Sequence, residues 1–200
     1  MAFDIAPELA DFARTTSPAP YRKARAAAVF GETARELVHL LKYRDRHDCA
    51  PVMAQLMERA GLEMIESADV IIPVPLHFSR LLARRYNQSE LLSRHISKRT
   101  GCASDSSLLK RKRATKPQVS LRGSERRTNV EDAFAVPDHH LSTVRGKRIL
   151  LVDDVFTTGA TVNACTRALL QAGVYRVDVL VFAIAGLGDV GHTTADMQDV

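Results

Sequence analysis

The sequence contains no tryptophan and only three cysteines, Cys49, Cys102 and Cys165, which lie far apart in the chain. No C-x-x-C spacing occurs, so we expect neither a zinc site nor a disulfide framework. Isolated cysteines fit a reducing compartment, and we expect a cytoplasmic protein. No apolar run is long enough to cross a membrane. Asp4 and Glu8 stand where a secretion signal would carry basic and then apolar residues.

Two further absences narrow the function. The chain has no internal repeat and no G-x-x-x-x-G-K-[ST] motif, which excludes a P-loop nucleotidase. Acidic residues are fewer than basic ones: the chain has 23 Asp and Glu and 28 Lys and Arg, which gives a formal net charge of +5. Anionic partners are therefore expected, either polyphosphorylated metabolites or nucleic acid. A length of 200 residues suits one domain with a sizeable core.

One stretch, residues 149–161, predicts a binding site. It opens with Ile-Leu-Leu-Val, an apolar run without alternation that is typical of a strand buried on both faces of a parallel sheet. Asp153 and Asp154 follow, and then a hydroxyl-rich turn with one glycine. A helix comes next, and its apolar stripe and expected stop are Val162, Cys165, Leu169 and Gly173.

A strand, turn and helix of this kind aim backbone N–H groups and a helix N-terminus at one point, which favours a phosphate. The hydroxyls of Thr157, Thr158 and Thr161 can donate to the same oxygens. Asp153 and Asp154 suit hydroxyl groups or a cation such as Mg²⁺, bound directly or indirectly. A sugar that carries a phosphate and free ring hydroxyls satisfies both demands.

Other sites also place two acids after a strand. A Walker B strand lacks its P-loop partner here, and a response-regulator pocket would not need Thr-Thr-Gly-Ala-Thr directly after the acids. A purely structural turn would leave the two carboxylates without a packing reason. The stretch resembles the phosphoribosyl-pyrophosphate (PRPP) signature of type I phosphoribosyltransferases.

The chain before this stretch predicts a helical region and then a first strand. Helical stripes begin at Arg22 and at Met53 and indicate two amphipathic helices, which would form a hood over the sheet. Between them, residues 42–47 predict a solvated helix–helix turn, whose cations could alternatively face a ligand. Residues 69–75 predict the first buried strand. A basic loop and a helix through Leu91, Leu92 and Ile96 follow. The expected division is a flexible arm (1–20), a helical hood (21–66), a core (67–186) and a flexible tail (187–200).

Two basic segments are candidates for binding anions. Arg80, Arg84 and Arg85 follow the first predicted strand and would lie at the same sheet edge as the acids, where they could hold a pyrophosphate. Residues 110–127 are more basic still and predict a long loop. This loop would be either a lid over a reactive sugar or a nucleic-acid contact. Its candidate residues are Lys110, Arg111, Lys112, Arg113, Lys116, Arg126 and Arg127.

Several blocks together resemble the ComF family, which comprises phosphoribosyltransferase-like proteins linked to competence and DNA uptake in bacteria. They cover most of residues 21–185 in family order. The blocks are Lys42-Tyr43-Arg44-Asp45, Pro73-Val74-Pro75-Leu76-His77, Arg84-Arg85-Tyr86-Asn87-Gln88, Thr115-Lys116-Pro117-Gln118, Arg126-Arg127-Thr128-Asn129-Val130-Glu131-Asp132-Ala133-Phe134 and the loop 153–161. Two departures stand out: residues 1–20 lack the cysteine pairs of the family's zinc module, and Arg85-Tyr86 replaces a frequent Gly-Phe.

The resemblance implies an α/β fold with a parallel sheet core and a hood, and PRPP with Mg²⁺ as the ligand. Asp153 and Asp154 would hold the ribose hydroxyls. The resemblance implies that the 5-phosphate is held by Phe156, Thr157, Thr158, Gly159, Ala160 and Thr161. It implies that the pyrophosphate lies against Val74, Pro75, Leu76, His77 and Arg80.

Three functions follow as hypotheses. The first is an enzyme that transfers the 5-phosphoribosyl group from PRPP to an unidentified base or amine and releases pyrophosphate. The second is an accessory protein of DNA uptake that binds single-stranded DNA through residues 110–127, with PRPP as a regulatory ligand. The third is a non-catalytic PRPP sensor. No membrane span is expected, and a homodimer is one candidate assembly.

Overall fold

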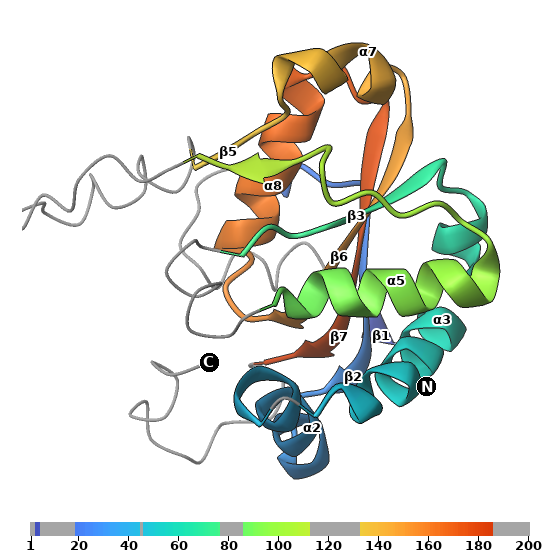
Figure 1. Cartoon of the computed structure of the whole chain (residues 1–200), viewed down its shortest axis with the longest axis vertical. Helices are drawn as coiled ribbons and strands as arrows, with labels where there is room; N and C mark the ends of the chain where they lie inside the picture. The colour runs from blue at the N-terminus through green and yellow to red at the C-terminus, as the bar shows by residue number, and fades with distance from the viewer. Residues whose placement is uncertain (1–2, 5–18, 45, 77–85, 113–132, 186–200) are drawn as a thin grey trace, which may run out of the picture.

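A five-stranded sheet forms the centre of the molecule in the computed structural model, which describes residues 3–4, 19–44, 46–76, 86–112 and 133–185 (Figure 1). The strand order is β1-β2-β7-β6-β3. Four of the strands are parallel to their neighbours, and only β1 runs antiparallel, beside β2. The strands are β1 (Phe3–Asp4), β2 (Lys23–Val29), β3 (Val70–Pro73), β6 (Arg148–Phe156) and β7 (Arg176–Ile184). The predicted parallel α/β sheet is therefore confirmed.

Helices cover both faces of this sheet (Figure 1). One face packs against α2 (Glu32–Tyr43), α3 (Ala50–Glu66) and α5 (Gln88–Thr100). The opposite face packs against α8 (Ala160–Gln171) and a small sheet of β4 (Lys110–Arg111) and β5 (Phe134–Ala135). Three short elements complete the described chain: η2 (His47–Cys49), η3 (Asp138–His140) and α7 (Leu141–Val144).

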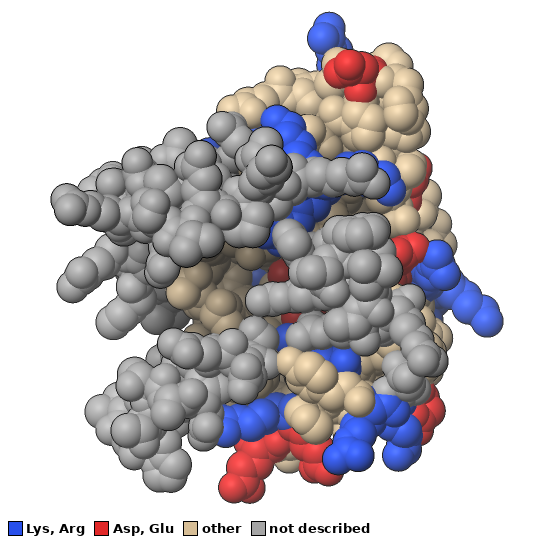
Figure 2. All heavy atoms as spheres, turned by 60° about the vertical axis from the view of Figure 1, so that its left-hand side comes forward, with Lys and Arg blue, Asp and Glu red and all other residues tan. Residues whose placement is uncertain are grey.

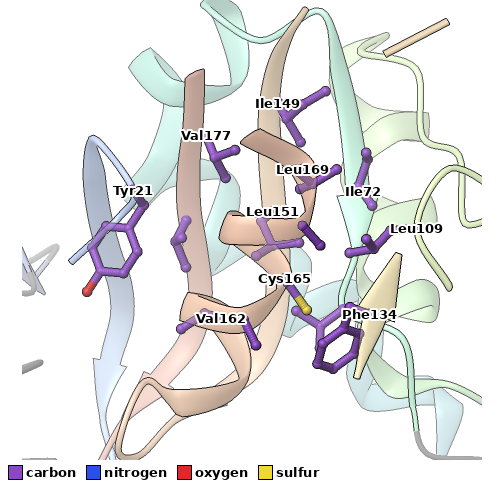
Figure 3. Packing of buried hydrophobic residues seen from close by; sticks show 14 of the residues in the cluster. Tyr21, Ile72, Leu109, Phe134, Ile149, Leu151, Val162, Cys165, Leu169 and Val177 are labelled. Carbon is purple, nitrogen blue, oxygen red and sulfur yellow. The ribbon is translucent and has the colours of Figure 1, made fainter. Parts of the chain in front are cut away.

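Burial on the two faces follows the strand periodicity. On β6, Ile149 and Leu151 belong to the cluster under α8, whereas Leu150 and Val152 belong to the cluster under α3 and α5, because successive strand residues point to opposite faces. Figure 3 shows Leu151 beside Cys165 of α8, with Phe134 of β5 closing the same cluster. The result is a three-layer arrangement in which β6 and β7 lie in the middle.

The helix expected from Arg22 is wrong over its first part, because residues 23–29 form β2. This segment, Lys-Ala-Arg-Ala-Ala-Ala-Val, is rich in helix formers, but propensity is a weak prior that tertiary pairing overrides. β2 pairs in parallel with β7 along its length, and Ala24 and Ala26 are buried there. The first strand of the core therefore precedes residues 69–75, and a purely helical hood over residues 21–66 is corrected to one strand and two helices.

Other predicted elements are confirmed. Helices lie over the second stripe (α3), over Leu91–Ile96 (α5) and after the acidic pair (α8), and Gly173 follows α8 with a φ of 88°. The arm and the tail lie almost wholly outside the described residues. Among the described residues, no helix is both long and apolar enough to cross a membrane.

Candidate active site

The acidic pair lies near the end of β6, at the carboxyl edge of the parallel sheet, where ligands bind in open α/β folds. β6 continues through Phe156, so Asp153 and Asp154 are consecutive strand residues and project in different directions. Their partners show this divergence. Asp153 accepts a hydrogen bond from Ser89 of α5, and Asp154 forms an ion pair with Lys42 of α2.

The ion pair of Asp154 is buried. Lys42 Nζ lies 3.2 Å from Asp154 Oδ2, and the two side chains are 6% and 12% exposed. Lysine is almost never buried without a partner, because removing its charge from water is costly. Lys42 also stands in the last turn of α2, where the helix dipole favours a cation. The pair therefore ties α2 to the end of β6.

Among the described residues, Asp153 has no counter-charge at so short a distance. Its Oδ1 accepts from Ser89 Oγ at 2.8 Å and from the backbone N–H of Asp154 at 2.9 Å. Desolvation, and next the negative charge of Asp154, raise the pKa of Asp153 to about 7, although the two hydrogen bonds and Lys42 act in the opposite direction. Near neutral pH this carboxyl group is therefore partly protonated.

The start of α5 connects Asp153 to the loop after β3. Asn87 is the N-cap of α5, since its Oδ1 accepts from Ser89 N, and its Nδ2 donates to the carbonyl oxygen of Val74 at 3.0 Å. One side chain thus fixes both the end of β3 and the residue that contacts Asp153. Gln88 is buried beside it, and its Nε2 has no hydrogen-bond partner among the described residues.

The pyrophosphate loop is described only in part. Val74, Pro75 and Leu76 follow β3 at the same sheet edge as the acids, and Val74 N donates to the carbonyl oxygen of Val152 on β6. His77 and Arg80 lie outside the described residues, as do Arg84 and Arg85.

The turn after the acids joins β6 to α8 and contains the residues predicted to bind the 5-phosphate. Thr157 and Thr158 are exposed, and Gly159 caps α8 with a φ of 73°, a conformation that favours glycine. A Cβ on Gly159 would lie 2.8 Å from Cζ of the buried Phe156 ring, so close packing also requires glycine. The first N–H groups of α8, near Ala160 and Thr161, point out of the helix end and suit an anion.

The basic stretch begins near the same site. Lys110 and Arg111 form β4, which pairs with β5, and the Arg111 guanidinium lies 5.2 Å from the centroid of the Phe134 ring. Lys112 is exposed, whereas Arg113, Lys116, Arg126 and Arg127 lie outside the described residues. Figure 2 shows Lys and Arg side chains, in blue, on the side of the molecule that lies at the left of Figure 1.

A bound Mg²⁺ does not fit the acidic pair as a closed protein site. No group of three or more His, Cys, Asp or Glu side chains that could hold a metal ion occurs in the part of the chain that the structure describes. One oxygen of Asp154 faces Lys42, and one oxygen of Asp153 accepts two hydrogen bonds. Mg²⁺ is usually held by one or two carboxylates together with substrate phosphates, so here it would arrive with a phosphorylated ligand.

Sequence reasoning missed two of these residues. Lys42 was expected in a solvated helix–helix turn or facing a ligand, but it is buried against Asp154. Ser89 was not singled out, although Asn-x-Ser before an apolar stripe is an N-cap signal that places Ser89 at the start of α5. The contact of each with an aspartate joins residues more than 60 positions apart, which no local pattern shows.

Comparisons with known proteins bear on the family and the fold of this chain. A family model described as the phosphoribosyl transferase domain matches residues 49–198. The DNA utilization protein YhgH of Salmonella typhi is 34% identical over 167 residues, which span 81% of this chain and 72% of that protein. Competence protein F of Haemophilus influenzae is 36% identical over 148 residues, 72% of this chain and 64% of that protein.

The chain belongs to the ComF family of phosphoribosyl transferase domain proteins. Its α/β fold is of the type I phosphoribosyltransferase kind, as the sequence predicted. A solved structure titled "structure of the allosteric regulatory enzyme of purine biosynthesis" is similar over 66% of this chain and 26% of that chain, with a TM-score of 0.46 and 20% identity. The roles of individual site residues in this ComF-family protein remain predictions.

Proposed function

We propose that this protein binds PRPP as its Mg²⁺ complex and transfers the 5-phosphoribosyl group to a nitrogen acceptor, with release of pyrophosphate. The observation that carries the proposal is the order of groups at one sheet edge. Two carboxylates at the end of β6 stand directly before a glycine-capped helix N-terminus. That order matches the order of ring hydroxyls and 5-phosphate along a phosphorylated ribose.

The ribose end of the ligand would be held from β6. The exposed hydroxyls of Thr157 and Thr158 and the first N–H groups of α8 would donate to the 5-phosphate oxygens. Carboxylate oxygens of Asp153 and Asp154 would accept hydrogen bonds from the ribose 2- and 3-hydroxyls. This grip fixes the sugar at both sides, and holding reactants in place is a large part of the rate advantage of an enzyme.

The pyrophosphate would leave on the side of the β3 loop. Val74 is fixed by Asn87 and by its own bond to β6, so the backbone after β3 is ordered before the ligand arrives. Bound Mg²⁺ supplies charge neutralisation of the leaving pyrophosphate. As the bond to C1 lengthens, positive charge would develop on the ribose, and the negative charges of Asp153 and Asp154 would stabilise it.

The three cysteines are free, and we keep the cytoplasm as the expected compartment.

The experiment is calorimetric titration of Mg²⁺–PRPP into the wild type and into the Asp153→Asn, Asp154→Asn double variant. We expect binding to the wild type and its loss in the double variant. Asp138→Asn, which neutralises an exposed carboxylate in η3, is the matched control and should bind like the wild type. Absence of binding to the folded wild type would overturn the proposal. A screen of bases and amines for pyrophosphate release then separates a transferase from a sensor.

DNA binding is the second candidate, and the names of the relatives favour it. The YhgH proteins are described as DNA utilization proteins, and other relatives as competence proteins. The basic stretch that begins at Lys110 would supply phosphate contacts, with PRPP as a regulatory ligand. Affinity for single-stranded DNA should then fall steeply with salt and drop when Lys110, Arg111 and Lys112 are neutralised. Unchanged affinity in that variant would place DNA binding elsewhere or exclude it.

A further inference from the structure

The buried cation Lys42 lies at the candidate active site, beside one of its two carboxylates. Only two side chains with a formal negative charge are buried in the described part of the chain, Asp154 and Asp178. Asp178 is paired with Arg22 and, at 3.7 Å, with Arg176, whose side chains are 43% and 25% exposed. Asp154 is neutralised by Lys42, which is 6% exposed and is therefore withdrawn from water together with its partner. The cation at the candidate active site is thus more deeply enclosed than either cation beside Asp178.

The backbone around Lys42 is held from several sides. Leu41 is fully buried in the cluster under the helices, and its carbonyl oxygen accepts a hydrogen bond from the Tyr86 hydroxyl. The Tyr86 ring meets the His47 ring edge-on, with centroids 4.2 Å apart. Tyr86 directly precedes Asn87, the N-cap of α5. These contacts therefore join α2 to α5, the helix whose Ser89 donates to Asp153. The ammonium group is therefore fixed beside Asp154 and is not a mobile surface charge.

An ammonium group at this position affects which cations Asp154 can take. Mg²⁺ requires oxygen ligands at about 2.0–2.1 Å in a nearly octahedral shell and gives up its waters reluctantly. Lys42 Nζ already lies 3.2 Å from one Asp154 oxygen, and a second cation on the same carboxylate would be repelled in an enclosed site. Hydroxyl groups meet no such repulsion. They can donate to the remaining lone pairs of a carboxylate that already faces an ammonium group.

We propose that Lys42 is a positioning residue that keeps Asp154 a hydroxyl-binding carboxylate by excluding divalent metal from it. The inference rests on the proposed function in taking ribose hydroxyls as the ligand of Asp154. Lys42 supplies the positive charge that a metal ion would otherwise supply, and Mg²⁺ is left to the pyrophosphate of the substrate. Two cations thus neutralise two different groups. Lys42 neutralises Asp154, which binds the ribose hydroxyls, and the Mg²⁺ of the substrate neutralises the leaving pyrophosphate.

The test measures metal binding without PRPP, by titrating Mn²⁺ and following its free-ion electron paramagnetic resonance signal. Wild type should bind Mn²⁺ weakly or not at all. Lys42→Met should bind Mn²⁺ at least tenfold more tightly, because Asp154 has lost its counter-ion. The Lys42→Met, Asp154→Asn double variant should lose that gain. Lys42→Arg, which restores a cation, should behave like the wild type. Circular dichroism melting checks that each variant is folded, and Lys42→Gln is the second neutral variant where Lys42→Met fails to fold.

Four results would overturn the proposal. The first is tight Mn²⁺ binding by wild type that Asp154→Asn abolishes, and the second is no gain in Mn²⁺ affinity in folded Lys42→Met or Lys42→Gln. The third is a gain in Mn²⁺ affinity that persists in the Lys42→Met, Asp154→Asn double variant. The fourth is an equal gain in Lys42→Arg. The first needs no Lys42 variant, so the test stands even where those variants are unstable. Failure of the proposed function is seen separately, as absence of PRPP binding to wild type in calorimetry, and it leaves the metal titration interpretable.

Discussion

Replacing Asp153 with asparagine should make the protein more stable at pH 8. The substitution removes the charge of a poorly solvated carboxylate. It also keeps Oδ1, which accepts the hydrogen bonds from Ser89 and from the backbone N–H of Asp154. Asn and Asp have nearly the same shape, so packing is preserved. The substitution removes the negative charge and replaces Oδ2 by an amide NH2 group. Burial together with the neighbouring charge of Asp154 makes that negative charge unfavourable in the folded state.

The sign of the pH dependence follows from proton linkage. The folded protein holds the Asp153 proton up to a pKa of about 7, whereas the unfolded chain releases it near the ordinary value of 3.8. Wild-type stability from this group is fully present below about pH 4 and is lost as the pH rises through about 7. At about 1.4 kcal/mol for each pH unit, the upper bound of the loss is about 4 kcal/mol. Relaxation and water penetration reduce it, so we expect about 1–3 kcal/mol.

The assay is urea unfolding followed by circular dichroism at pH 5 and pH 8 in metal-free buffer. The stability difference should favour Asp153→Asn over wild type at both pH values and should be less than half as large at pH 5 as at pH 8. Asp178→Asn is the matched control with the opposite sign. It disrupts the bidentate pair between the buried Asp178 carboxylate and the partly exposed Arg22, and it should destabilise by about 2 kcal/mol. An Asp153→Asn variant that is less stable than wild type at pH 8, or a gap that does not change with pH, would refute the reasoning.

Three further substitutions have definite expected outcomes. Gly159→Ala forces a Cβ to 2.8 Å from the Phe156 ring at a φ of 73°, so melting should show a loss of about 1–3 kcal/mol and calorimetry a weaker affinity for PRPP. Asp69→Asn removes the carboxylate that accepts from the side chain and backbone N–H of Arg148, contacts that hold the pKa of Asp69 well below its usual range. Its stability loss, about 1 kcal/mol at pH 7, should shrink in urea titrations as the pH falls below about 4. Tyr86→Phe deletes the hydroxyl that donates to a carbonyl in the last turn of α2, and thermal melts should show a loss of about 1 kcal/mol.

The sequence predicted the β6–α8 unit well because its signals are local. An unbroken apolar run, two acids and a turn with Gly159 lie within 13 consecutive residues, and each has one structural meaning in that order. The same holds for Gly173, whose φ of 88° ends α8 where the stripe of apolar residues ends. These features depend on neighbours in the chain and not on distant partners.

Features that depend on distant partners were not predicted. β2 is alanine-rich and lies in the sheet because β7 pairs with it about 155 residues later in the chain. Lys42 has the sequence context of a solvated helix end, and only the packing of α2 against the carboxyl edge of the sheet buries it. Ser89 contacts Asp153 through the same kind of long-range packing. A lysine between leucine and tyrosine in a helix stripe gives no local indication of an ion pair.

The two adjacent carboxylates have different electrostatic roles because β6 does not turn between them. Asp154 faces Lys42, so much of its charge is already balanced before any ligand binds. Among the described residues, Asp153 has hydrogen bonds without an equally close cation, and the protein bears the unfavourable free energy of its charge. Sites that bind or react are where such unfavourable groups are retained, because a ligand can relieve them. Positive charge that develops on a bound ribose would be stabilised more by Asp153 than by Asp154, whose charge Lys42 already balances. In the proposed reaction, therefore, Asp154 would orient the sugar, and Asp153 would provide the larger share of the electrostatic stabilisation of the positively charged ribose.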